Sequence, residues 1–120
     1  MLVATPEYNG AMPGALKNAL DWLSRPVEEG LVLERKPVAI IGASKGPLGS
    51  IRAQLNLRVV LHKMDVAVVG QPEFVLPHAH KALAGDELPA GSPSLPILTA
   101  VVEGLVDLIE RRRAAASLTC

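Results

Sequence analysis

The sequence predicts an α/β fold in which helices flank a parallel β-sheet. Two short apolar runs, 38–41 and 66–69, show no polar alternation, which is typical of strands covered on both faces. Between and after these runs, apolar residues recur with the 3.6-residue period of amphipathic helices. A hydrophobic share of 49% against a charged share of 20% favours a folded chain over disorder.

The first elements are a short strand and a helix, joined by a loop rich in turn residues. Residues 2–5 read as the end of an apolar strand, and the loop 6–14 is rich in Pro, Gly and Asn. The helix that follows starts near Pro13 and ends before Pro26. Its predicted apolar face comprises Leu16, Ala19, Leu20 and Leu23.

The rest of the chain repeats this alternation. Strand 38–41 leads into a small-residue loop at 42–49, then a helix and the strand 66–69. Residues 85–96 contain three prolines and are predicted to form a loop before the last helix. The apolar faces of the two helices are Leu57, Val60, Leu61 and Met64, and Leu98, Val101, Val102, Leu105, Leu108 and Ile109. This order predicts right-handed βαβ units within a single domain, 1–120.

Composition argues against several classes of partner. Twelve basic side chains balance twelve acidic ones, so no nucleic-acid surface is predicted. The single cysteine, Cys120, excludes a disulfide framework. No stretch approaches the roughly 20 apolar residues that span a bilayer, and the N-terminus lacks the basic region of a signal peptide. We therefore expect a cytoplasmic protein with no membrane partner.

Two loops are the candidate binding site. In open α/β sheets, ligands bind outside the carboxyl ends of the strands, and the loops 5–14 and 42–49 occupy that position. The first loop offers the aromatic ring of Tyr8 and backbone N–H groups that could hydrogen-bond a planar heterocycle. Pro6, Asn9 and Gly10 are also ordinary turn residues, so the residue pattern alone leaves a purely structural loop open.

Two sequence blocks point to a known family. The first reads PEYN-x(3)-PG-x-LKNALDW-x-SRP at residues 6–26, and the second reads KPVAIIGAS-x-G-x(2)-G-x(2)-RAQ-x(2)-LR at residues 36–58. Their order and placement resemble the NADPH-dependent FMN reductase family, which includes chromate, quinone and azo reductases. The resemblance extends from residue 2 to about residue 72 and implies a flavodoxin-like parallel sheet with flanking helices.

The resemblance also implies a cofactor site. In that family, Pro6, Glu7, Tyr8 and Asn9 would line the isoalloxazine ring of FMN, largely through backbone groups. Contacts from the second loop would come from Ser44 and Gly46. No catalytic side chain is implied, because the flavin accepts a hydride from NADPH or NADH and passes electrons to a small-molecule acceptor. Relatives are usually homodimers or homotetramers, and the helix 16–25 would be part of that contact.

The chain departs from the family pattern at its start. It begins inside the family's third strand, so we expect an N-terminally truncated domain lacking the first two strands and their helices, including the loop that holds the FMN phosphate. Ala11 stands where many relatives carry serine. The strand 2–5 would then be an exposed edge, which predicts either self-association or a longer natural chain. The alternative to an oxidoreductase is a catalytically silent truncated scaffold, or oligomerisation remnant, that does not retain FMN.

Three other kinds of site were compared with the sequence: a hydrolase triad, a dinucleotide-binding loop and a metal site. Residues 42–46 fit the G-x-S-x-G nucleophile elbow, and Ser44, Asp65 and His78 could be arranged as a triad. Gly42, Gly46 and Gly49 do not match the dinucleotide spacing. A metal site is the third possibility, although the spacing matches no standard zinc pattern. Its candidate ligands are His62, His78, His80, Asp86 and Glu87.

Overall fold

The structure is a computed structural model, and it describes residues 1–118. Its elements in chain order are β1 (Leu2–Thr5), α1 (Gly14–Leu23), β2 (Pro37–Ala43), α2 (Ile51–Lys63), β3 (Ala67–Val68), β4 (Phe74–Leu76), α3 (Ala79–Ala82) and α4 (Leu95–Ser117).

All the described strands pair in parallel around β2. β1 lies along one side of β2, with Thr5 opposite Gly42. β3 and β4 lie along the other side, where Val38 is opposite Val68 and Ile41 is opposite Phe74. The predicted α/β fold with a parallel sheet is therefore confirmed, and β1 lies at one edge of the described sheet.

Two predicted boundaries need correction. The strand expected at 66–69 is only two residues long. The chain stops pairing with β2 around Gly70 and Pro72, and it pairs with β2 again as β4. Proline cannot donate to a strand ladder, so an interruption there is expected. The loop expected to reach Pro96 ends at Ser94, because Pro96 lies in the first turn of α4, where its missing N–H costs nothing.

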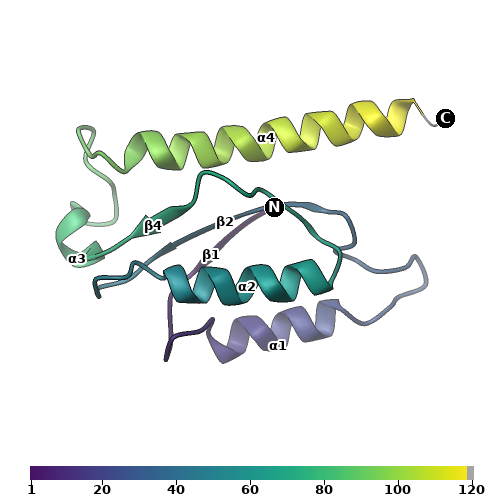
Figure 1. The fold of residues 1–120 in the computed structure, drawn as a ribbon, viewed down its shortest axis with the longest axis horizontal. Coiled ribbons are helices and arrows are strands. Elements are labelled where there is room, and N and C mark those ends of the chain that lie inside the picture. The colour runs from purple at the N-terminus through teal and green to yellow at the C-terminus, as the bar shows by residue number, and fades with distance from the viewer. Residues whose placement is uncertain (119–120) are drawn as a thin grey trace.

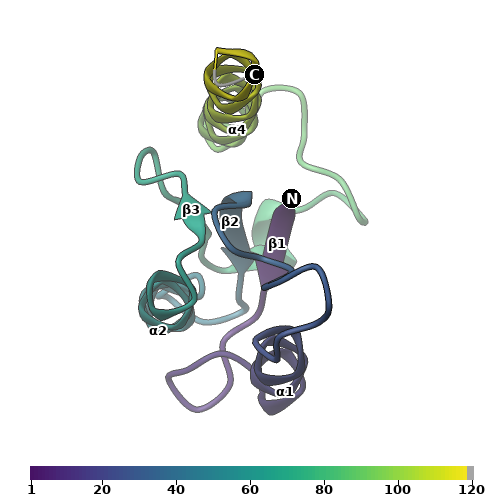
Figure 2. The same cartoon turned by 90° about the vertical axis from the view of Figure 1, so that its right-hand side faces the viewer.

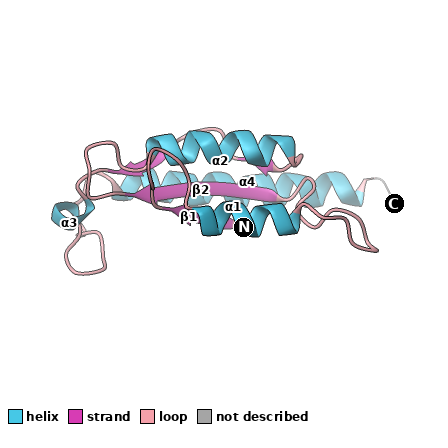
Figure 3. Ribbon diagram, turned by 90° about the horizontal axis from the view of Figure 1, so that it is seen from below, coloured by secondary structure: helices cyan, strands magenta, loops and turns pink. Residues whose placement is uncertain are grey.

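The sheet is covered on both faces. Helices α1 and α2 lie side by side on one face, and α4 lies on the other (Figures 1 and 2). In Figure 3, α1 and α2 flank the line of β2, with α4 behind it. In β2, Val38 and Ile40 pack with the α1–α2 layer, and Ala39 packs with α4.

The predicted helical faces are largely confirmed. Leu20, Leu57, Leu61, Val101 and Leu105 are buried in the two core clusters. Three residues of the predicted faces, Ala19, Leu23 and Val102, are exposed instead, so Leu20 is the one fully buried residue of α1. Within the described residues, no helix is both long enough and apolar enough to cross a membrane.

Candidate functional site

The two candidate loops meet at one end of the sheet. Because β1 and β2 are parallel neighbours, the chain leaves both strands at the same edge. Residues from both loops line a hollow of about 250 Å³. Four of the six residues expected to contact flavin line it: Glu7, Asn9, Ser44 and Gly46.

The other two expected residues lie outside this hollow. Pro6 lines a neighbouring hollow of about 320 Å³, with Ala4, Ile41 and Phe74 among its other walls. Tyr8 is 60% exposed, at the rim of the first loop. Residues that the sequence reasoning did not single out also line the main hollow; these are Gly10, Pro47, Leu48 and Arg52.

The first loop is a tight hairpin turn. The Tyr8 N–H donates to the Ala11 carbonyl at 2.9 Å, and the Ala11 N–H donates to the Tyr8 carbonyl at 3.1 Å. The two central residues, Asn9 and Gly10, have φ values of +53° and +76°. Such a turn favours Asn-Gly, because both central positions need positive φ. It leaves the N–H groups of Asn9 and Gly10 outside the hairpin's own pair of bonds.

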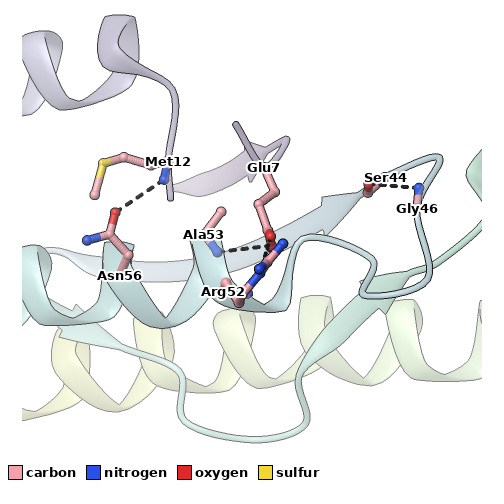
Figure 4. Close-up of polar contacts among 7 residues, drawn as sticks. All are labelled: Glu7, Met12, Ser44, Gly46, Arg52, Ala53 and Asn56. Atoms are coloured by element: carbon pink, nitrogen blue, oxygen red, sulfur yellow. Dashed lines mark hydrogen bonds and ion pairs between the residues drawn. The ribbon is translucent and has the colours of Figure 1, made fainter. Parts of the chain in front are cut away.

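Glu7 connects this loop to the start of α2 (Figure 4). Its carboxylate accepts hydrogen bonds from the Arg52 N–H at 3.0 Å, the Ala53 N–H at 3.3 Å and the Arg52 Nε at 2.5 Å. Burial by itself would raise the pKa of Glu7, but the hydrogen bonds from Arg52 and Ala53 and the charge of Arg52 outweigh it and hold that pKa below its ordinary value. The carboxylate is therefore ionised at neutral pH.

A second contact anchors the far side of the turn. The Met12 N–H donates to Asn56 Oδ1 at 3.2 Å, and the Met12 side chain is only 7% exposed in the core beside Leu20 and Leu57. Contacts to α2 therefore flank the turn on both sides (Figure 4).

The second loop is held by the Ser44 hydroxyl, by the last residue of β4 and by the segment that follows β4. Ser44 Oγ accepts a hydrogen bond from the Gly46 N–H at 3.1 Å. The Ser44 N–H donates to the Leu76 carbonyl at 3.0 Å, and the His78 N–H donates to the Gly46 carbonyl at 3.0 Å. Hydrogen bonds within the chain therefore hold this loop, and Ser44 is one of the residues that line the hollow.

The hydrolase triad is wrong. The carbonyl of Asp65 accepts a hydrogen bond from the N–H of Arg35, which lies just before β2, whereas Ser44 follows the far end of β2. A seven-residue strand is about 20 Å long, so Asp65 cannot reach a histidine beside Ser44.

The remaining motifs have structural explanations. Gly42 and Gly49 lie where backbone and side chains approach closely, Gly42 against Ser50 and Gly49 against Leu76 and Pro77. Across residues 1–118, no three His, Cys, Asp or Glu side chains form a group that could hold a metal ion.

The chain is similar to a family of reductases and to individual reductases within it. Residues 1–81 match the sequence model of the family described as NADPH-dependent FMN reductase. The chain is 50% identical over 78 residues to a 2-hydroxy-1,4-benzoquinone reductase of Burkholderia sp, covering 65% of this chain and 42% of that protein. It is 49% identical over 82 residues to an NAD(P)H-dependent FMN reductase of Pseudomonas aeruginosa, covering 68% of this chain and 43% of that protein.

A solved structure shows the same arrangement. FerB, a flavoenzyme NAD(P)H:(acceptor) oxidoreductase from Paracoccus denitrificans, is similar with a TM-score of 0.75 and 32% identity, over 92% of this chain and 60% of FerB. This likeness confirms the expected flavodoxin-like fold class. The chain matches about two fifths of the length of the two curated relatives above.

Proposed function

Because the chain belongs to the NADPH-dependent FMN reductase family, we propose that it binds FMN by the isoalloxazine ring and acts as an NAD(P)H-dependent oxidoreductase. The observation that carries the proposal is the hollow where the two matched loops meet, lined by Glu7, Asn9, Ser44 and Gly46. Whole small-molecule sites usually measure about 300–1,000 Å³. A hollow of about 250 Å³ suits part of a ligand, such as a planar ring system, better than all of FMN.

The residues present fit a flavin ring. The turn supplies backbone N–H groups at Asn9 and Gly10, the Ser44 hydroxyl supplies a polar contact, and Pro6 and Tyr8 lie beside the same edge. When bound, FMN supplies the hydride and electron transfer, so the protein's part is to bind and orient. We propose a small-molecule acceptor of quinone type, with NADPH or NADH as donor, in the cytoplasm.

Riboflavin and FMN are expected to bind with similar affinity. Riboflavin carries the same ring without the phosphate, and the only cation lining the described hollow, Arg52, is already paired with Glu7. A charge-assisted contact to the phosphate would typically favour FMN over riboflavin by about tenfold or more. Because the described hollow offers no free cation for such a contact, we expect the two dissociation constants to differ by less than about tenfold. Titration of each flavin with protein, followed by quenching of flavin fluorescence, measures both constants.

Two outcomes of this titration would contradict the proposal in different ways. A strong preference for FMN would place the dominant contact at the phosphate instead of the ring. Quenching by neither flavin would favour the alternative, a catalytically silent scaffold that does not retain FMN.

The outer face of the α1–α2 layer supports a homodimer or homotetramer. Trp22 on α1 is 73% exposed, and Leu55 and Val59 on α2 are 52% and 69% exposed. Large apolar side chains at this exposure are typical of surfaces that pack against another subunit. We propose that this face, with α1 at its centre, forms the contact between copies.

Trp22→Glu is expected to convert the oligomer to monomer, because a carboxylate in an apolar interface leaves an unpaired buried charge. Size-exclusion chromatography with light scattering measures the mass of each variant. Thr99→Glu is the matched control, since Thr99 is an exposed polar residue of α4, at the opposite face of the sheet. Trp22 is also the sole tryptophan, so its fluorescence should shift to longer wavelength on dilution. Monomers in the unsubstituted protein, or dissociation by the control alone, would contradict the interface.

A further inference from the structure

Glu7 lies in a loop, yet its charged side chain is almost fully buried. It is only 6% exposed, whereas the side chain of its partner Arg52 is 59% exposed. Its two carboxylate oxygens accept three hydrogen bonds, two of them from backbone N–H groups in the first turn of α2. The side chain thus points away from the end of β1 and onto the helix that follows the second loop (Figure 4).

The Arg52 guanidinium connects Glu7 to the turn itself. A methyl group placed at Gly10 would lie 3.8 Å from Arg52 Cζ and Nη1, which is ordinary van der Waals contact. The guanidinium therefore lies beside the turn, with room for about one methyl group between it and Gly10, and it pairs with the Glu7 carboxylate. Glu7, Gly10 and Arg52 all line the same hollow as Ser44.

We infer that Glu7 is a positioning residue for the flavin-ring loop: by accepting hydrogen bonds from the first turn of α2 and holding Arg52 beside Gly10, its carboxylate fixes the 8–11 turn beside the Ser44 loop. The inference rests on the proposed function. A loop that is already in its binding geometry pays less conformational entropy when a ligand arrives, so its affinity is higher. Glu7 acts on affinity through the loop it holds.

The substitution Glu7→Gln removes the negative charge and keeps the size of the side chain. Glutamine offers one oxygen acceptor, and its NH₂ group would face the N–H donors of Arg52 and Ala53. At least one of the three hydrogen bonds is lost, and the attraction to the guanidinium is lost with it. We expect the turn to open more often in Glu7→Gln while the core stays folded.

Amide hydrogen exchange of the flavin-free protein, measured by NMR, tests the loop directly. In Glu7→Gln, the Tyr8 and Ala11 amides, which close the turn, should exchange about tenfold faster or more, while the buried α2 amides of Leu57 and Leu61 keep their protection. Glu103→Gln, on the exposed side of α4, is the matched control and should change none of these amides. If Glu7→Gln does not fold, Arg52→Gln serves instead, because it removes the guanidinium and leaves the backbone N–H groups in place.

A flavin titration of the same variants completes the test. FMN affinity should fall about tenfold in Glu7→Gln and stay unchanged in Glu103→Gln. Unchanged exchange at Tyr8 and Ala11, or unchanged FMN affinity in Glu7→Gln, would overturn the role of Glu7 alone. An unsubstituted protein that binds no flavin would overturn the proposed function and the ring-positioning role together.

Discussion

Gly42→Ala is expected to destabilise the fold by about 3 kcal/mol or more, at the upper end of the cost of overpacking a core. A methyl group at Gly42 would lie 1.9 Å from Ser50 Oγ and 2.5 Å from the Thr5 carbonyl oxygen. Thr5 is the residue opposite Gly42 in the β1–β2 ladder, so its backbone cannot move without disturbing the strand pair. Urea unfolding at neutral pH, followed by circular dichroism, measures the change in the free energy of unfolding.

Two further variants locate the cause of this loss. Gly14→Ala, at the start of α1, should change stability by less than about 1 kcal/mol, because nothing lies within 4 Å of the added methyl group. Adding Ser50→Gly to Gly42→Ala should recover part of the loss, since it removes the closest clash at a residue whose φ is +76°. A Gly42→Ala protein as stable as the unsubstituted one would contradict the close approach of β1, β2 and α2.

Leu57→Ala is expected to cost about 3 kcal/mol, within the usual range for removing a fully buried leucine. Leu57 is 0% exposed, at the centre of the cluster that joins the α1–α2 layer to β2. The same cluster contains Met12, whose backbone anchors the first loop. The loss should therefore also weaken flavin binding at temperatures where the protein is still folded. Thermal unfolding with and without FMN measures both effects.

Leu118→Ala is the matched control for this substitution. It removes the same atoms from a side chain that is 86% exposed, so its effect should stay within about 0.5 kcal/mol. Equal losses from the two variants would contradict the assignment of Leu57 to the core.

The layered architecture could be predicted because its signals are local. Apolar runs and the 3.6-residue period lie within single elements, and they correctly assign Leu20, Leu57 and Val101 to the core. The placement of both loops at one edge follows from the parallel order alone. The strand β4 and the short helix α3 were not predicted, since elements of three or four residues are too short for a periodic signal.

The internal support of the site could not be predicted. The Glu7–Arg52 pair joins residues 45 positions apart, and no spacing pattern within either loop indicates it. A motif that names Glu7 as a flavin contact also does not show that its side chain points to α2. Arg52 belongs to the second sequence block, but its place beside Gly10 depends on the turn geometry, which only the folded chain displays.

We expect the two loops of this chain to hold a flavin that NAD(P)H reduces. The most direct test is a visible absorption spectrum of the purified protein after incubation with FMN and desalting, followed by NADPH or NADH without oxygen. We predict a retained flavin band at about 450 nm that the nicotinamide nucleotide bleaches. A colourless protein after desalting would contradict flavin retention, and a retained band that neither nucleotide bleaches would contradict the reductase.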